Sequence, residues 1–227
     1  MTEISRRHFL YLSAGCPFMV QLSAFAAQDK GSNSAISYPR TIVVLQEAFR
    51  TEMIAYKNYI GYTSKALNEK YPNIAYLFQS FSYSEKIHAD HYKRILAALG
   101  YQAKPFQPEI KVLDTKSNLQ KTAQNELMKI KTIYPAFIRE LEAESCEEAI
   151  VYCMYSWKSH QQHEEIVKII DKYSGMFFSS VSGKIEGLNL DFHVCRVCGS
   201  TIEKVPDSPC VICNKPKSNY QRIERPV

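Results

Sequence analysis

Four cysteines near the C-terminus constrain what this chain can fold into more than any other feature. They form two Cys-x2-Cys pairs with eleven residues between the pairs: Cys195, Cys198, Cys210 and Cys213. Two such pairs can bring four thiolates to one tetrahedral metal ion, either Zn or a single Fe. Gly199 and Asn214 follow the pairs, and both tolerate the positive φ that turns backbone N–H groups back toward the sulfurs. Two disulfides are the alternative in an exported chain. Regular pairs around a turn favour the metal site.

The size and charge of the chain limit the classes of protein to consider. At 227 residues there is room for one large domain and one small domain. The net charge of +5 comes without a cluster of lysines or arginines, so nucleic acid is not an expected partner. This also counts against a zinc ribbon for nucleic acid as the role of the cysteines. Cys146 and Cys153 lie about 10 Å apart on a predicted helix, too far for a mutual disulfide.

The N-terminus predicts export. Residues 5–10 read Ser-Arg-Arg-His-Phe-Leu and fit a twin-arginine signal, and residues 24–26 read Ala-Phe-Ala and fit a cleavage site. Gly15, Pro17 and Gln21 interrupt the apolar stretch between them, so no stable membrane span is expected after cleavage. An uncleaved anchor is the alternative. The twin-arginine route carries folded proteins and suits a metalloprotein loaded before export, so we expect a periplasmic or otherwise exported protein.

Helical periodicity divides the rest of the chain. Apolar residues recur at helical spacing in four segments: 38–69, 72–99, 115–144 and 146–173. The inward stripe expected for the first segment is Leu45, Phe49, Glu52, Tyr56 and Ile60. Pro135 should kink the third segment, and Gly100 should stop the second. The expected domains are a signal peptide at 1–26, a spacer at 27–37, a four-helix bundle at 38–180 and a metal knuckle at 181–227.

The inward-facing stripes of these helices contain polar residues. Six of them fall at similar depth: Glu52, Glu85, His88, Glu126, His160 and His163. Burying six polar groups is costly unless they satisfy one another, and bound cations would allow this. Glu85-x-x-His88 places a carboxylate and an imidazole on one helix face, as in carboxylate-bridged dimetal bundles. The stripes therefore predict a metal site inside the bundle.

The link between the second and third helices also fits such a bundle. Residues 101–114 contain two prolines and no helical period. Fourteen extended residues span about 46 Å at most. A 27-residue helix is about 40 Å long, so the link can run the length of the bundle, as a ferritin-like crossover requires.

These features together resemble the rubrerythrin family over roughly residues 40–227. The strongest pieces are SEKIHADHYKRI, KTIYPAF, SHQQHEEIV and the cysteine segment. The resemblance implies a mainly α fold, with a ferritin-like four-helix bundle followed by a small rubredoxin-like four-cysteine domain. It also implies a non-haem di-iron centre that reduces hydrogen peroxide. Electrons would come from Fe in the four-cysteine site, commonly across a homodimer interface, and from an electron donor protein.

The resemblance implies a ligand set when it is carried over position by position. The bundle ligands and catalytic residues would be Glu52, Glu85, His88, Glu126, His160 and His163. The expected metals are Fe at the four cysteines, with Zn as the alternative, and in the bundle either two Fe or one Fe with another divalent metal. A tyrosine such as Tyr56 is a candidate proton donor.

Two positions depart from the family pattern. Lys129 stands where the family has a second carboxylate on the third helix, and His160 stands where it has a Glu on the fourth. The site therefore has three carboxylates instead of five, and we expect it to bind metal more weakly, to favour Fe(II), or to hold a single metal. Glu164 is the nearest candidate to replace the missing carboxylate, whereas His91 and His193 are expected to be ordinary, partly exposed histidines.

Two functions remain open at this point. One is an exported peroxide reductase. The other is a non-catalytic periplasmic electron-transfer or iron-binding protein whose bundle site has decayed. Lys129 and His160 decide between them.

Overall fold

The computed structural model describes residues 38–227, without the side chains of 165, 166, 169 and 174–176. The predicted export signal at 1–26 and spacer at 27–37 lie outside the described residues. The helices are α1 (Pro39–Asn68), α2 (Pro72–Ala98), α3 (Thr115–Met128), the π-helical η2 (Lys129–Ile133), α4 (Tyr134–Glu142), α5 (Glu147–Gln161) and α6 (Glu164–Glu186). The knuckle contains β1 (His193–Cys195), β2 (Thr201–Ile202), the 3-10 helix η3 (Lys217–Asn219) and β3 (Tyr220–Arg222). The predicted fold class, a helical bundle followed by a four-cysteine knuckle, is confirmed.

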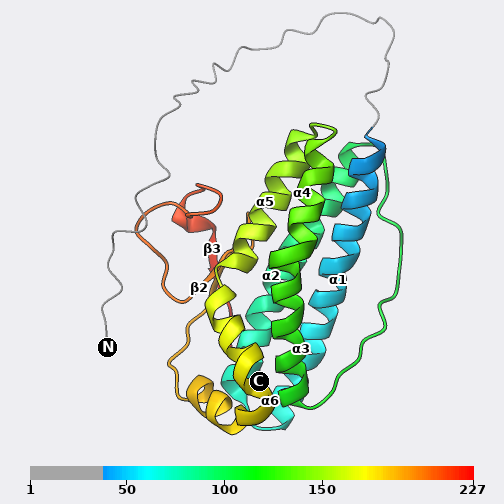
Figure 1. Ribbon diagram of the computed structural model, residues 1–227. Helices are drawn as coiled ribbons and strands as arrows, with labels where there is room; N and C mark the ends of the chain where they lie inside the picture. The colour runs from blue at the N-terminus through cyan, green and yellow to red at the C-terminus, as the bar shows by residue number, and fades with distance from the viewer. Residues whose placement is uncertain (1–37) are drawn as a thin grey trace, which may run out of the picture. The chain divides into compact units, whose positions relative to one another are not determined.

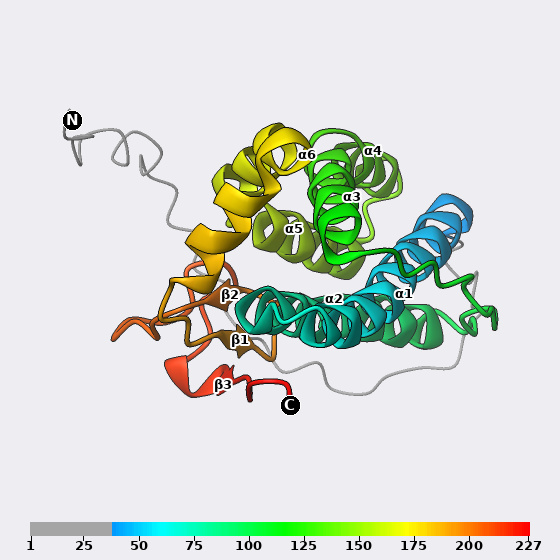
Figure 2. The ribbon, with the colours of Figure 1, turned by 90° about the horizontal axis from the view of Figure 1, so that it is seen from below.

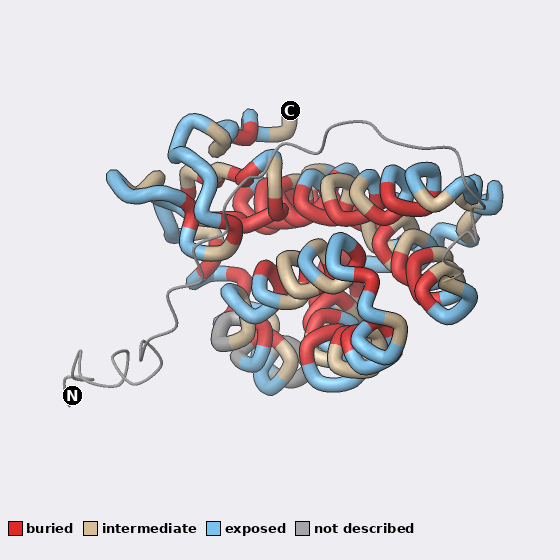
Figure 3. The backbone as a smooth tube through the Cα atoms, turned by 90° about the horizontal axis from the view of Figure 1, so that it is seen from above, coloured by how far each residue is buried: buried red, intermediate tan, exposed pale blue. Residues whose placement is uncertain are grey.

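The bundle consists of two antiparallel helix pairs. α1 packs against α2, and the α3–η2–α4 segment packs against α5 and α6 (Figures 1 and 2). Buried positions follow the helix faces that point toward one another (Figure 3). Two apolar clusters fill the interior, one centred on Tyr59 and Phe78, the other on Leu45 and Tyr92. Within residues 38–227, no helix combines the length and the apolar character that crossing a membrane requires.

The inward face of α1 differs from the predicted stripe in its second half. Leu45 and Glu52 are buried as expected, but the face continues through Tyr59. Ile60, expected inside, is 43% exposed. In an α-helix, the residue seven positions after Glu52 returns to nearly the same face, whereas the residue eight positions after it does not. The buried face therefore continues through Tyr59 and not through Ile60.

Carboxylates from neighbouring helix ends cap several helices. Glu144 accepts hydrogen bonds from the first N–H groups of α1, and Glu186 accepts those of Asn73 and Ile74 at the start of α2. These N–H groups have no partner within their own helix, and the positive end of the helix dipole favours an anion there. The caps fix where the helices begin relative to each other.

The third helix contains a π turn in place of a simple proline kink. Pro135 has no N–H to donate, and the turn before it widens so that Tyr134 N donates to Lys129 O. The carbonyl of Ile130, which Tyr134 would use in an α-helix, instead accepts a 2.8 Å hydrogen bond from Trp157 Nε1. The π turn begins at Lys129.

The fourth predicted helix is broken. α5 ends at Gln161, and α6 begins at Glu164 after a break at Gln162 and His163. α6 is kinked at Phe177, where the backbone leaves helical geometry, and extends past residue 180, where the sequence predicts the bundle to end.

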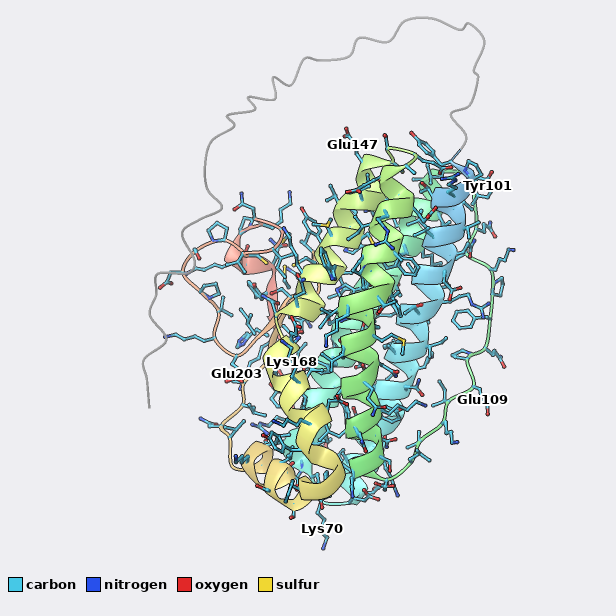
Figure 4. All side chains as sticks on the ribbon, in the orientation of Figure 1. Lys70, Tyr101, Glu109, Glu147, Lys168 and Glu203 are labelled. Carbon is cyan, nitrogen blue, oxygen red and sulfur yellow. The ribbon has the colours of Figure 1, made fainter. Side chains whose placement is uncertain are left out.

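The crossover link follows α1 along its length. Figure 4 shows it descending from Tyr101 past Glu109 toward the end of the bundle marked by Lys70. Near its start the link bonds to Gln46 of α1, and near its end Thr115 N donates to Glu69. This is the ferritin-like crossover that the length of the link predicts.

The knuckle lies against α2. Its antiparallel sheet has the order β2-β1-β3 and lies beside α2 in Figure 2. Tyr76 of α2 donates to Ile223 O and accepts from Phe192 N. Arg225 donates to Asn73 Oδ1 and lies over the Tyr76 ring. The chain's last residues are thereby fixed to its own second helix.

Candidate metal centres

The four cysteines form a closed set of sulfurs. All four are buried, and their Sγ atoms are 3.8 Å apart for Cys195 and Cys213 and 3.5 Å apart for Cys198 and Cys210. Four sulfurs about 2.3 Å from a metal in a tetrahedron lie about 3.8 Å from one another. The residues therefore fit one tetrahedral ion. Four thiolates suit Fe and Zn alike.

The backbone around the sulfurs has the predicted turns. Gly199 and Asn214 have φ values of 76° and 55°. Their N–H groups donate to the carbonyls of Cys195 and Cys210, which closes each turn. Tyr220 adds a hydrogen bond of 3.2 Å from its hydroxyl to Cys210 Sγ. Burial raises the pKa of Tyr220, so its hydroxyl stays a donor.

A second cluster of polar side chains is buried where the helices face one another. None of its members is more than 4% exposed: Glu52, Glu85, His88, Glu126, Lys129 and His160. They come from α1, α2, α3, η2 and α5. The structure thus brings five of the six predicted bundle ligands together around Lys129.

The ammonium group of Lys129 lies among the carboxylates. Its Nζ is 2.7 Å from Glu52 Oε2 and 3.0 Å from Glu85 Oε1. Glu126 Oε1 is 3.6 Å away. Burial alone disfavours the ammonium form, but these carboxylates outweigh it and raise the pKa of Lys129. Lys129 therefore carries a positive charge in the middle of the cluster.

His160 has one occupied and one unpartnered ring nitrogen. Its Nδ1 is 2.6 Å from Glu126 Oε2. Its Nε2 is buried without a hydrogen-bond partner among the described residues, 3.7 Å from Glu52 Oε1 and 3.9 Å from Glu85 Oε2. A nitrogen that faces two carboxylates in this way is a candidate metal donor.

The remaining acids and His88 differ in their protonation. Burial and the nearby Glu52 raise the pKa of Glu85 well above its ordinary value. Burial alone would raise the pKa values of Glu52 and Glu126, but Lys129 and His160 lower both. Burial lowers the pKa of His88 to about 3, so its imidazole is neutral at physiological pH, as a metal ligand must be.

The donor set fits one metal ion. Glu52, Glu85, His88 and His160 each offer a ligand atom, and these atoms lie within 4.8 Å of one another. Lys129 Nζ lies between Glu52 and Glu85, two of the carboxylates of this donor set.

Two tyrosines adjoin the cluster. Tyr59 donates a 2.7 Å hydrogen bond to Glu126, and Tyr134 donates to Glu52. Tyr56, the example given among the candidate tyrosines, lines a surface pocket with Ile60 instead. Sequence reasoning missed Tyr59, although its spacing of seven residues from Glu52 places both on one helix face.

His163 and Glu164 are not among the four residues whose ligand atoms lie within 4.8 Å of one another. His163 Nε2 is 3.1 Å from the carbonyl of Thr201 in the knuckle. Glu164 pairs with Lys168 at 3.1 Å, so it does not replace the missing carboxylate. The break between α5 and α6 explains both departures, since a continuous helix would keep residue 163 near the face of His160. No proline or glycine marks this break.

The two centres meet at His88. Its Nε2 is 3.1 Å from the carbonyl oxygen of Cys198, and its Nδ1 is 3.4 Å from Glu85. Ser84 donates to Gly199 O at 2.7 Å, and His91 Nε2 is 2.7 Å from Val197 O. One hydrogen bond thus joins Cys198 of the knuckle to His88 of the bundle cluster within one chain. His91 is a docking residue here, while His193 Nδ1 lies 3.1 Å from the carbonyl oxygen of Asp191, two residues before it.

The fold and the two sites define a class of protein, a ferritin-like helical bundle with an attached rubredoxin-like four-cysteine domain. The rubrerythrin sequence profile matches residues 44–170, more than half of the chain. The chain belongs to the rubrerythrin family. Members of this family are peroxidase-type oxidoreductases, and its bundle centre is a non-haem di-iron site.

Individual relatives agree over most of their length. Rubrerythrin-2 of Clostridium acetobutylicum is 26% identical over 78% of this chain and 93% of its own. Nigerythrin of Nitratidesulfovibrio vulgaris is 25% identical over 83% of this chain and 89% of its own. A structure of nigerythrin in its fully reduced, all-ferrous state superposes with a TM-score of 0.68 at 23% identity, covering 85% of this chain and 91% of that one, which supports the shared fold.

Proposed function

We propose that this protein is an exported peroxide reductase in which the four-cysteine centre passes electrons to the bundle cluster of the same chain. The observation that carries the proposal is the 3.1 Å contact between Cys198 O and His88 Nε2. Because the two sites are in contact, iron bound by the thiolates would be an electron donor close to the carboxylate–imidazole cluster, which would be the acceptor when it holds a metal. Iron in the four-cysteine site is part of the proposal.

The reduction of hydrogen peroxide consumes two electrons and two protons and yields two molecules of water. Ferrous iron, when bound in the two centres, supplies the electrons. The protein holds protons near the reaction on the hydroxyls of Tyr59 and Tyr134. Both hydroxyls donate to cluster carboxylates.

A pocket of about 190 Å³ leads toward the cluster between α1 and η2. Its lining includes Lys129 and Tyr59 at the inner end. Asn58 Oδ1 and Tyr62 OH also line it, and both are buried without a hydrogen-bond partner among the described residues. A small molecule that donates and accepts hydrogen bonds, as peroxide does, suits such a lining.

The test is to oxidise the reduced, iron-loaded protein with hydrogen peroxide. The rate is measured from the visible absorption of the thiolate-bound iron, which returns on oxidation. We expect Glu85→Gln to slow this oxidation by about 100-fold or more, because a ligand of the bundle metal is lost. Glu109→Gln, on the exposed crossover, is the matched control and should leave the rate unchanged.

The second candidate function is non-catalytic electron transfer or iron binding, and the position of Lys129 favours it. In that case peroxide would oxidise the thiolate-bound iron directly. Equal rates in the Glu85→Gln variant and the unaltered protein would support this alternative and contradict the peroxide reductase.

Export is the part of the proposal that rests on the N-terminal sequence. Arg6 and Arg7 form the twin-arginine pair. Replacing both by lysine should retain the protein in the cytoplasm, which fractionation of cells with an antibody would reveal. Equal export of the lysine variant would contradict this route.

A further inference from the structure

We propose that the ammonium group of Lys129 takes the place of one of the two bundle metals, so that this bundle holds a single metal ion bound by Glu52, Glu85, His88 and His160. The inference rests on the proposed function, since it concerns the same cluster. It differs from the di-iron centre of the family in the number of ions and in the role of the third helix.

The first argument is the position of Lys129. It stands where the family pattern has a carboxylate, and its Nζ lies 2.7 Å from Glu52 and 3.0 Å from Glu85. A metal ion bound by one oxygen of each of these carboxylates would occupy the same space. A cation fixed in this space repels a second metal and supplies the positive charge that the carboxylates require.

The second argument is the small number of donor atoms that face one another. Glu52 accepts from Lys129 and Tyr134, but its Oε1 also lies 3.7 Å from the unpartnered Nε2 of His160. Glu126 is already engaged by Tyr59 at 2.7 Å, by His160 Nδ1 at 2.6 Å and by Lys129 at 3.6 Å. His163 faces the knuckle at Thr201. Among the described residues, four ligand atoms therefore remain to bind one ion. They belong to Glu52, Glu85, His88 and His160, whose Nε2 is unpartnered.

The third argument is charge. Three carboxylates, one ammonium group and one divalent ion balance when the imidazoles are neutral. A second divalent ion would leave two uncompensated positive charges in a site whose residues are at most 4% exposed. Uncompensated buried charge is strongly unfavourable.

The π turn keeps Lys129 in place. Lys129 is the first residue of η2, and its carbonyl accepts the π-helical bond from Tyr134 N. Trp157 Nε1 closes the turn through Ile130 O. Because the backbone is fixed by these bonds, the ammonium group is a built-in part of the site rather than a surface side chain that bends inward.

Titration with Co(II) counts the ions. The metal-depleted full-length protein is titrated without oxygen, and the thiolate and bundle sites are separated by their different absorption bands. We expect two Co(II) per chain, one at the cysteines and one in the bundle. Lys129→Glu restores a carboxylate and should bind three, with magnetic coupling between the bundle ions in electron paramagnetic resonance. Lys131→Glu, which makes the same change at an exposed position of η2, should bind two.

A second variant, Lys129→Gln, tests the proposal if Lys129→Glu does not fold. Lys129→Gln removes the ammonium group without adding a ligand, and the bundle Co(II) should then bind tighter by more than about tenfold. Three ions in the unaltered protein, one ion, or unchanged Co(II) affinity in Lys129→Gln would each overturn the proposal. None of these results depends on whether the protein reacts with peroxide.

Discussion

At the scale of single residues, Tyr220 contributes a hydrogen bond to a sulfur of the four-cysteine centre, and such a bond influences the reduction potential of bound iron. Its hydroxyl donates to Cys210 Sγ at 3.2 Å and lies 3.2 Å from Ser200 Oγ. Hydrogen bonds to the sulfurs stabilise the more negative, reduced state of a thiolate-bound iron. Tyr155 packs against the same cysteines, but no hydrogen bond joins its hydroxyl to a sulfur within residues 38–227.

We therefore expect Tyr220→Phe to lower the reduction potential of the iron-loaded knuckle by on the order of tens of millivolts. A potentiometric titration followed by visible absorption measures the shift. Tyr155→Phe is the matched control and should leave the potential unchanged. A rise in potential, or equal shifts in both variants, would count against the role of this hydroxyl.

The sequence predicted most residues of the two centres, but not how they are arranged. The cysteine spacing was sufficient because the tetrad is local and its turns are short. Lys129 and His160 were recognised as departures from the family pattern. That Lys129 lies between carboxylates depends on a π turn, and this turn arises from a distant tryptophan as well as from Pro135. The contact of His163 with the knuckle could not be predicted, because the helix breaks where no proline or glycine signals it.

At the scale of helices and turns, α3 begins at a side-chain cap. Asp114 accepts hydrogen bonds from Ser117 N and Ser117 Oγ. The backbone bond and the hydroxyl bond lower the pKa of Asp114. A carboxyl group with a lowered pKa stabilises the fold above its ordinary pKa, and this contribution is lost as the pH falls through the folded-state pKa.

Asp114→Ala should therefore lower the free energy of unfolding by about 1 kcal/mol near pH 7. The difference should shrink below pH of about 4, where the cap in the unaltered protein becomes protonated. Urea unfolding at both pH values measures it. Asp114→Asn keeps a capping oxygen and should lose less stability at pH 7. A difference that persists unchanged in acid would contradict the charged cap.

The knuckle and α2 meet closely at Gly199. A Cβ atom there would lie 2.3 Å from His88 Nε2 and 2.8 Å from Ser84 Oγ, and the positive φ adds strain. Helix periodicity predicted α1 and α2 to within one residue at each end. Helix periodicity could not predict the contact at Gly199. The side chains of α2 bond there to backbone carbonyls, which are present whatever the knuckle sequence is.

Gly199→Ala should separate the knuckle from His88 while leaving the four cysteines able to bind metal. We expect the peroxide-driven oxidation of the thiolate-bound iron to slow by about tenfold or more, since electron transfer weakens steeply when a direct contact is lost. The visible spectrum should be retained. Gly183→Ala in α6, where an added Cβ meets no atom within 4 Å, is the control. Unchanged kinetics in Gly199→Ala would show that this contact does not carry electrons.

At the scale of the whole molecule, one chain contains both centres and the contact between them. The resemblance to rubrerythrins led us to expect electron transfer across a homodimer interface. In the structure, the knuckle is fixed to its own bundle by Tyr76, Ser84, His88 and His91. The geometry therefore supports transfer within a chain, whether or not two chains associate.

Mixing two defective variants tests this central claim most directly. Cys195→Ser/Cys198→Ser removes the thiolate centre, and Glu85→Gln impairs the bundle cluster in another chain. The two are produced together in one cell so that any dimer can contain both. We predict that peroxide oxidises the thiolate-bound iron of the mixture no faster than that of Glu85→Gln alone. Recovery of fast oxidation in the mixture would show transfer between chains and would contradict the account.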